Sequence, residues 1–233
     1  MVAESHRGEL VRVALIVPSS NTILENDLHR SLPKDRYSVH TDRMYLIETT
    51  REAEIEMIER YAPAAAADLG TVVPDLLVFG CTSAGSLFGL DYDAKVCKAL
   101  SEKAGCEVIG VVTAAAAALD RRDSKKVAVL TPYIEELTAS VAKALEAPGR
   151  EIVAAHGMGI SVNVELADPT PAEIVNFAKE RLQGCQFDTV FVSCTNFRAL
   201  EAIPLLEEAL NTTVITSNSA VVEAIRLKFE GEV

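Results

Sequence analysis

The sequence predicts an α/β protein in which two similar halves of the chain each form a parallel sheet. Short apolar runs of strand length alternate with longer segments of helical character, which is typical of parallel strands joined by helical crossovers. The chain also repeats itself loosely, because residues 11–18 resemble residues 126–132 and both runs end at a proline turn. The repeat indicates two sheets of related construction.

The first half contains three apolar runs typical of buried parallel strands and a fourth, less apolar candidate. They occupy residues 11–18, 76–80, 108–114 and, for the fourth, 37–40. Helices are expected between them, because Thr49 and Glu52 have the spacing of a capping box, while Gly70 and Gly105 are suitable helix ends. The acidic stretch from Glu52 to Glu59 is interpreted as the solvated face of the helix that Thr49 begins.

The second half follows the same plan. Its candidate strands occupy residues 126–132, 151–155, 189–193 and 213–220. Thr170 and Glu173 form a capping box with Pro171 at the first helical position, and Gly184 is a suitable end for that helix. A last helix is expected over about residues 219–229.

A polar stretch, residues 119–124, follows the alanine run 114–118 and is where we place the boundary between the halves. We therefore divide the chain into residues 1–119, residues 120–217, and a C-terminal helix within residues 218–233 that is expected to pack back onto the first half. The first two parts carry one candidate sheet each.

Composition excludes several classes of protein. The 233 residues are 49% hydrophobic, enough to bury a substantial core in one compact unit or two small domains. The net charge of −12 argues against a nucleic-acid partner, because contact with a phosphate backbone needs clustered Lys and Arg. No run of 18 or more apolar residues appears, and the N-terminus lacks the charged-then-apolar order of a secretion signal, so we expect no membrane association and a cytoplasmic location.

Cysteine and histidine usage argues against a disulfide framework and against a metal site. The five cysteines are an odd number without a CxxC spacing, and the four histidines are scattered. Cys97, Cys106 and Cys185 are interpreted as buried structural residues, since free cysteine is among the most buried residue types.

The other two cysteines, Cys81 and Cys194, occupy matching places in the two halves. Each follows an apolar run and opens into a polar turn. Ligands of open parallel sheets bind beyond the carboxyl ends of the strands, which is where both thiols are expected. A turn that leads into a helix N-terminus lowers the pKa of a thiol and favours a bound carboxylate. Two such thiols facing one cleft would act on one carbon centre.

Several short motifs, in this order, resemble those of a known group of enzymes. They are residues 18–22, 80–83, 131–133, Asn163 and residues 193–198. Over about residues 11–224 the chain resembles the maleate cis-trans isomerase and arylmalonate decarboxylase branch of the aspartate/glutamate racemase superfamily. The resemblance implies a pseudo-twofold pair of Rossmann-like domains with the active site in the cleft between them. It also implies no metal or organic cofactor, a small carboxylate substrate and a homo-oligomer.

The resemblance assigns roles to nine residues. It implies that Cys81 is the nucleophile and Cys194 the proton donor. The substrate carboxylates would be bound by Asn21, Thr82, Ser83, Tyr133, Asn163, Thr195 and Asn196. A thiolate is suited to adding to an electron-poor alkene, and the addition leaves a single bond that can rotate before elimination. The second thiol protonates the carbanionic carbon and later takes the proton back. Maleate to fumarate is the preferred reaction.

Three alternatives stay open at this stage. Thr82 and Ser83 follow Cys81 as two hydroxyls do in the arylmalonate decarboxylases, although those enzymes carry glycine at the position of Cys81. Two thiols around a carboxylate would also suit a racemase, in which one removes the α-proton and the other returns it on the opposite face. Paired lobes of this kind also serve as ligand clamps, so a two-lobed binding protein without activity is the third alternative.

Overall fold

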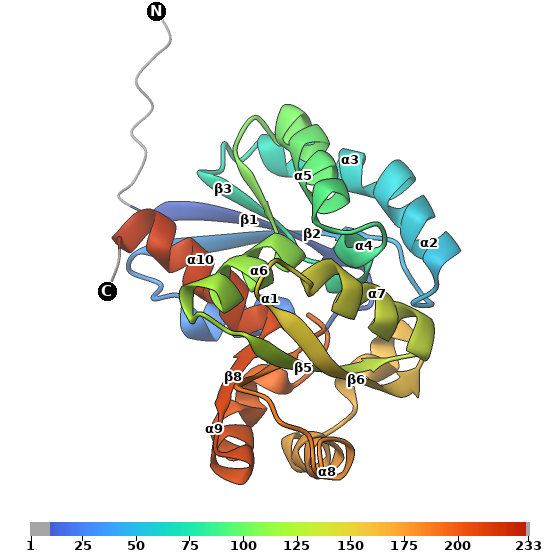
Figure 1. The fold of residues 1–233 in the computed structure, drawn as a ribbon. Helices are drawn as coiled ribbons and strands as arrows, with labels where there is room; N and C mark the ends of the chain where they lie inside the picture. The colour runs from blue at the N-terminus through green and yellow to red at the C-terminus, as the bar shows by residue number, and fades with distance from the viewer. Residues whose placement is uncertain (1–9, 232–233) are drawn as a thin grey trace, which may run out of the picture.

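The computed structural model describes residues 10–231 and contains two four-stranded parallel sheets (Figure 1). The strands of the first sheet are β1 (Val11–Pro18), β2 (Tyr37–Met44), β3 (Leu76–Phe79) and β4 (Val108–Gly110). Those of the second are β5 (Lys126–Tyr133), β6 (Glu151–Ile160), β7 (Thr189–Val192) and β8 (Thr213–Thr216). The predicted α/β class with two related parallel sheets is confirmed.

The two sheets have equivalent strand orders, β2-β1-β3-β4 and β6-β5-β7-β8. In each sheet the chain goes from the first strand to a neighbour on one side and then crosses to the other side of the first strand. The crossing creates a switch point at the carboxyl ends of β1 and β3, and another at those of β5 and β7. The residues of β3 and β7 are buried throughout, as expected of strands covered by helices on both faces.

Helices connect the strands. In the first half they are α1 (Leu24–Ser31), α2 (Arg51–Glu56), the π-helical turn η1 (Met57–Tyr61), α3 (Ala62–Gly70), α4 (Thr82–Ser86), α5 (Leu90–Ala104) and α6 (Val111–Arg121). In the second they are α7 (Glu135–Leu145), the 3-10 turn η2 (Asn163–Ala167), α8 (Pro171–Arg181), α9 (Ala199–Leu210) and α10 (Ser217–Glu230). None of the described helices is long and apolar enough to cross a bilayer.

Two predicted strands are shorter than expected. The candidate at residues 108–114 ends at Gly110, and the candidate at 213–220 ends at Thr216, because a helix begins at the next residue in each case. The start of α6 is stabilised by Asp93 of α5, whose carboxylate accepts hydrogen bonds from the backbone N–H (3.2 Å) and the hydroxyl (2.6 Å) of Thr113. A cap supplied by another helix overrides the strand preference of Val111 and Val112.

Helix ends are predicted more accurately than strand ends. The capping box of Thr170 and Glu173 is present, and Gly105 ends α5 in the left-handed conformation. The exception is α2, whose N-cap is Thr50 rather than Thr49; the Thr50 hydroxyl accepts the backbone N–H of Ala53 at 3.4 Å. This shift of one residue releases Thr49 for a contact with the second half.

The C-terminal helix α10 packs against α6 and α1 of the first half (Figure 1). The Tyr37 hydroxyl donates to Glu230 at 2.7 Å, and Lys228 forms an ion pair with Glu107 at 2.6 Å. The division of the chain at residues 119 and 217 stays a proposal, and α6 continues through Arg121, beyond the first of these positions.

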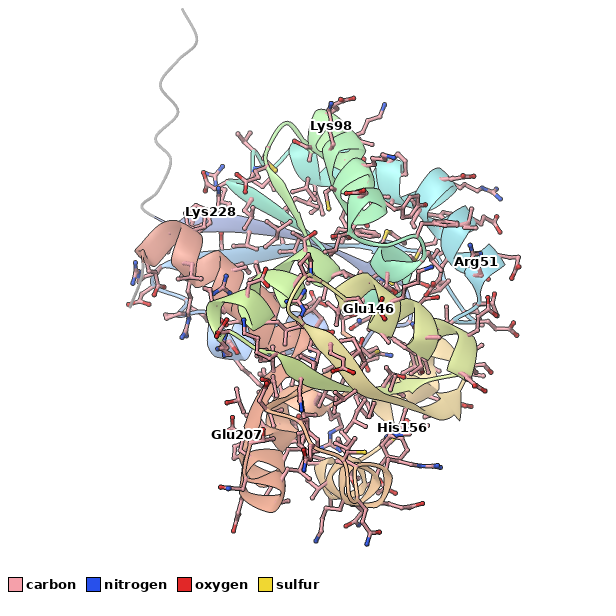
Figure 2. All side chains as sticks on the ribbon, viewed as in Figure 1. Arg51, Lys98, Glu146, His156, Glu207 and Lys228 are labelled. Carbon is pink, nitrogen blue, oxygen red and sulfur yellow. The ribbon has the colours of Figure 1, made fainter. Side chains whose placement is uncertain are left out.

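The charged side chains project outward from both halves (Figure 2). Lys98 on α5 and Glu207 on α9 lie at opposite ends of the molecule, and both are exposed. The negative net charge is thus spread over the outer surface, with a few buried carboxyl groups as exceptions.

Candidate active site

The predicted site residues gather where the carboxyl ends of the two sheets meet. Asn21 follows β1, Cys81 follows β3, Tyr133 ends β5 and Cys194 follows β7, so all four strands that flank a switch point contribute. The nine predicted residues are each between 1 and 4% exposed. They therefore form one buried polar cluster at the junction of the two halves.

Direct hydrogen bonds join the two cysteine-bearing loops. The hydroxyls of Thr82 and Ser217 are hydrogen-bonded at 2.9 Å, and the Ser217 hydroxyl accepts the backbone N–H of Cys194 at 3.0 Å. The Thr195 hydroxyl donates to the carbonyl oxygen of Gly80 at 3.0 Å. A Cβ at Gly80 would lie 2.7 Å from the carbonyl oxygen of Ile16, so the close approach of this residue to β1 needs glycine. The loops of Cys81 and Cys194 thus form a single hydrogen-bonded unit.

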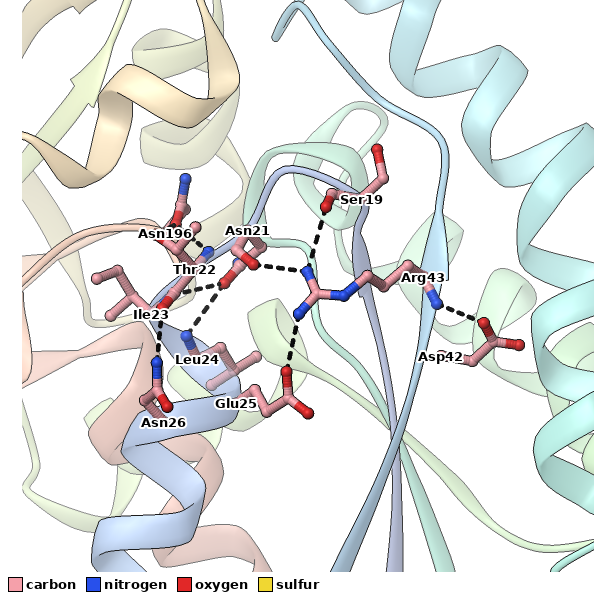
Figure 3. Close-up of polar contacts among 10 residues, drawn as sticks. All are labelled: Ser19, Asn21, Thr22, Ile23, Leu24, Glu25, Asn26, Asp42, Arg43 and Asn196. Atoms are coloured by element: carbon pink, nitrogen blue, oxygen red, sulfur yellow. Dashed lines mark hydrogen bonds and ion pairs between the residues drawn. The ribbon is translucent and has the colours of Figure 1, made fainter.

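Two asparagines tie the loop after β1 to the loop after β7; Figure 3 shows the contact of Asn196 with Thr22 and the contacts of Asn21 with the start of α1. The Asn21 side-chain amide donates to the Thr195 hydroxyl at 3.1 Å, and its oxygen accepts two backbone N–H groups at the start of α1. The Asn196 oxygen accepts the backbone N–H of Thr22 at 2.8 Å, and its amide donates to the Asn163 carbonyl at 2.6 Å. Asn21 is therefore both a helix cap and a bridge between the halves.

Arg43 on β2 fixes the same loop from outside the cluster (Figure 3). Its guanidinium donates to the carbonyl oxygens of Ser19 (3.2 Å) and Asn21 (2.7 Å) and to the Glu25 carboxylate (2.8 Å). Two carbonyls and a carboxylate together hold the guanidinium in one orientation, which keeps the Asn21 backbone in place.

Two covering segments, residues 45–50 and residues 161–163, close over the cluster from opposite halves. They form an isolated antiparallel bridge, in which the N–H of Thr49 donates to the Ser161 carbonyl at 2.8 Å and the N–H of Asn163 to the Ile47 carbonyl at 2.9 Å. The Asn163 amide also donates to the Ser20 hydroxyl at 2.7 Å. The bridge and the Asn163 side chain thus join the two halves beside the buried thiols.

Cys194 has a strained backbone and two hydrogen-bond donors at its sulfur. Its φ is +114°, a conformation that favours glycine, and such outliers cluster at functional sites. The backbone N–H of Asn196 donates to Sγ at 3.2 Å, and the Tyr133 hydroxyl forms a second hydrogen bond. Burial raises the pKa of the Cys194 thiol to about 12, while both hydrogen bonds act to lower it.

Cys81 lies at the N-cap of α4. Burial raises the pKa of its thiol, the charge of Glu54 raises it further, and hydrogen bonds from the Ala84 backbone and the Ser83 side chain lower it. The charge of Cys194 also acts on it, so the two sulfurs share one electrostatic environment.

The expectation that helix N-termini lower both thiol pKa values is therefore wrong for the closed site. The backbone donors exist at both sulfurs, but loss of water outweighs them. The segment at Thr195 and Asn196 is moreover a turn, because α9 begins only at Ala199.

Glu54 of α2, which is not among the predicted site residues, adjoins the cluster. Its side chain is fully buried, its Oε1 accepts a hydrogen bond from the Ser83 hydroxyl, and its Oε2 has no partner. Burial raises the pKa of Glu54 to about 8, against the opposing effect of the Ser83 hydrogen bond. The interpretation of the acidic stretch as solvated is wrong for this residue. Helical spacing was the available signal, since Met57 and Ile58, three and four positions on, are buried and apolar.

The other three cysteines differ in burial. Cys97 is buried as expected and Cys106 is partly buried, whereas Cys185 is exposed, which corrects its interpretation as a buried residue. Arg198 forms an ion pair with Glu201 at 2.9 Å. Within residues 10–231 no group of three His, Cys, Asp or Glu side chains is arranged to hold a metal ion.

The arrangement is suited to proton transfer and to sulfur addition on one small acid. It offers two thiols, hydroxyl and amide donors for carboxylate oxygens, and surroundings from which water is excluded when the site is closed. A dry site strengthens each of these polar contacts.

Comparisons with known proteins agree with this architecture. The sequence model of the arylmalonate decarboxylase family matches residues 13–230. A maleate isomerase of Geobacillus stearothermophilus is 25% identical over 229 residues, covering 92% of this chain and 90% of the relative. A maleate isomerase structure from Pseudomonas putida S16, solved with maleate, gives a TM-score of 0.87 at 23% identity and covers 95% of this chain and 92% of that one. A structure of arylmalonate decarboxylase gives 0.77 at 22% identity, with coverages of 95% and 94%.

Proposed function

Since the chain belongs to the arylmalonate decarboxylase and maleate isomerase family of the aspartate/glutamate racemase superfamily, we propose that it is a two-cysteine isomerase that converts maleate to fumarate. The observation that supports this most is the hydrogen-bonded unit formed by the loops of Cys81 and Cys194. The unit gives two thiols a common environment at the carboxyl ends of β3 and β7.

In the proposed reaction the Cys81 sulfur adds to one alkene carbon of maleate. The electron pair of the double bond moves to the other carbon, which takes the proton of Cys194. Rotation about the resulting single bond brings the carboxylates to the trans arrangement. Cys194 then removes the proton, the C–S bond breaks, and fumarate leaves. No electron acceptor or cofactor is required for this balance.

Polar groups around the thiols are proposed to bind the two carboxylates. The donors are the side chains of Asn21, Thr82, Ser83, Tyr133, Asn163, Thr195 and Asn196. Asn21 and Asn163 donate to hydroxyls across the junction in the closed site, so substrate carboxylates would replace contacts between the halves. We also propose, by likeness to the family, that the chain forms a homo-oligomer.

A decarboxylase of substituted malonates is the second candidate. The buried hydroxyls of Thr82 and Ser83 favour it, because they would stabilise the enediolate that forms when carbon dioxide leaves. The nucleophilic position of Cys81 disfavours it, since such a reaction needs a single proton donor.

Proton NMR of the purified protein in heavy water tests the proposal. Maleate should give the vinyl signal of fumarate, while substituted malonates and single enantiomers of aspartate and glutamate should stay unchanged. Loss of carbon dioxide would indicate the decarboxylase instead, and exchange of an α-proton a racemase.

Replacement of either thiol tests the roles of the two cysteines. Cys81→Ser and Cys194→Ser should each lower kcat/KM for maleate by about 10³-fold or more, because each removes a step that the other thiol does not perform. Cys185→Ser, at an exposed position, is the matched control and should leave the rate unchanged. Unchanged rates in both Cys81 and Cys194 variants would rule out the two-thiol mechanism.

A further inference from the structure

Glu54 is a buried acid that the proposed reaction does not yet use. The Cys81 sulfur and the Ser83 hydroxyl oxygen are 3.7 Å apart, and the same hydroxyl donates to Oε1 of Glu54. Cys81, Ser83 and Glu54 therefore form a continuous path from the thiol to a carboxylate. All three side chains are buried, with exposed fractions of 3%, 2% and 0%.

We propose that Glu54 is the acceptor of the Cys81 proton, which reaches it through the Ser83 hydroxyl. The proposal rests on the proposed role of Cys81 as the nucleophile. Glu54 acts through Ser83 and not on the substrate, so it prepares the thiol for attack.

The transfer conserves atoms and charge. The S–H bond of Cys81 breaks, its proton passes to the Ser83 oxygen, and the original hydroxyl proton of Ser83 passes to Oε1 of Glu54. The sulfur electron pair then forms the C–S bond. On elimination both protons move back, so the enzyme ends in its starting state.

The surroundings of Glu54 favour this role over that of a structural ion pair. Among the described residues no cationic side chain contributes to its pKa, which burial and the Ser83 hydrogen bond determine. Its Oε2 is buried without a partner, an arrangement that costs about 1–3 kcal/mol and that a merely structural carboxylate would avoid. The site thus keeps a carboxyl group that gains stability by accepting a proton.

The titratable groups facing Glu54 are Cys81 after β3, Tyr133 at the end of β5 and Cys194 after β7. The charge of Glu54 raises the pKa of all three, so a thiolate beside an ionised Glu54 is unfavourable. When the Cys81 proton moves to Glu54, the negative charge moves from the carboxylate to the sulfur, so Cys81 and Glu54 together still carry one negative charge. With a pKa raised to about 8, Glu54 becomes a competent acceptor as the pH approaches that value.

Site-resolved alkylation of the wild-type protein by iodoacetamide tests the proposal without any substrate. Mass spectrometry gives the rate at Cys81 relative to exposed Cys185 over a range of pH. Glu54→Gln and Ser83→Ala each interrupt the path and should slow Cys81 alkylation about tenfold or more near pH 8, where the wild-type rate rises with ionisation of Glu54. Glu52→Gln, an exposed carboxylate on the same helix, is the control and should react like the wild type.

The sign of the effect separates the proposal from a purely electrostatic role. If Glu54 only repels the thiolate, Glu54→Gln lowers the Cys81 pKa and speeds alkylation, which would overturn the proposal. Equal rates of Cys81 alkylation in wild type, Glu54→Gln and Ser83→Ala would overturn it as well. The same holds if Cys81 stays unmodified in all three proteins while Cys185 is alkylated. If circular dichroism shows that Glu54→Gln is unfolded, Ser83→Ala decides.

The outcome is independent of the maleate assay. A protein that does not convert maleate but loses Cys81 reactivity on Glu54→Gln keeps the proton path and loses the proposed substrate. If the protein converts maleate but Cys81 reactivity is the same in the variants and the wild type, the proposed substrate stands and the proton path does not.

Discussion

The two thiols are prepared by different neighbours. Cys81 faces a hydroxyl that is itself bound to a carboxylate, whereas Cys194 faces the phenol of Tyr133 and a backbone N–H. A carboxylate accepts a proton, which suits the surroundings of a nucleophile such as Cys81. A phenol donates a hydrogen bond, which suits the surroundings of a proton donor such as Cys194. This asymmetry supports the proposed assignment of roles.

Tyr133→Phe should weaken the acid-base function of Cys194. Loss of the phenol hydrogen bond removes an effect that lowers the Cys194 pKa, so the thiolate that takes the proton back becomes harder to form. We expect site-resolved alkylation of Cys194 at a given alkaline pH to slow about tenfold, the effect of one hydrogen bond to a charged group. Tyr92→Phe, at a tyrosine of α5 outside the covering segments, should change nothing. Equal Cys194 reactivity in Tyr133→Phe and wild type would contradict the donor role.

Single residues were predictable where they follow strands. Asn21, Cys81 and Cys194 come within three residues of the ends of buried strands, and topology brings such positions together. Glu54 was not predicted, because it stands among exposed acidic residues; the apolar Met57 and Ile58 mark the helix face that it shares, where α2 packs on α4. A carboxylate among other carboxylates is indistinguishable from a solvated one until the helix face is known.

The covering segments are the elements whose separation we expect to open the site. Each is held to the other by two backbone hydrogen bonds, and side chains on one of them, Tyr45 and Ile47, are 55% and 56% exposed. The side chains of Tyr45 and Ile47 are therefore solvated before the segments separate, whereas Leu46 between them is buried. Segments of this kind open at low free-energy cost compared with buried strands.

Hydrogen exchange should detect this opening. The amides of Thr49 and Asn163, which form the bridge, should exchange about 100-fold or more faster than the amides of β1 and β3, although all are hydrogen-bonded. Mass spectrometry of peptides covering residues 45–50 and 161–163 measures this, and saturating maleate should slow the exchange. Protection equal to that of β1 would mean that the site opens elsewhere.

Elements were predicted where one signal dominates and missed where two compete. The capping box at Thr170 and the glycine at Gly105 determine helix ends locally, and both are confirmed. Residues 111–114 have strand-forming valines but become helical, because Asp93 caps α6 from another helix. Local sequence preferences do not predict contacts between segments that are distant in the sequence.

The two halves of the molecule are joined both at the site and by the packing of α10 on the first half. The hydrogen bonds of Asn21 to Thr195 and of Thr22 to Asn196 cross the junction at the functional cluster, while α10 contacts the first half on its outer side. The loose repeat in the sequence predicted the equivalence of the sheets. It did not predict how closely their carboxyl ends meet, which depends on side chains from four loops.

Buried carboxyl groups make the stability of the whole molecule depend on pH. Burial raises the pKa of Glu54 to about 8 and that of Asp27 to about 6, the latter against a hydrogen bond from the Asn218 amide at 2.7 Å. Because both pKa values are raised in the folded state, folding binds protons. Their stabilising contribution is complete below the pKa values of the unfolded chain and is lost as the pH rises through about 6 for Asp27 and about 8 for Glu54.

Glu54→Gln should remove the larger part of this dependence. The Gln side-chain oxygen still accepts the Ser83 hydroxyl, but no buried charge forms as the pH rises. Urea unfolding at about pH 5.5 and about pH 9 should therefore show the variant gaining about 3 kcal/mol relative to wild type between the two conditions. Glu52→Gln, which removes the same charge from an exposed position of α2, should follow the wild type. If the free energy of unfolding depends on pH equally in the two variants, the Glu54 carboxyl is ionised at no cost in the folded protein. The protonation equilibrium that the proposed path to Cys81 requires is then absent.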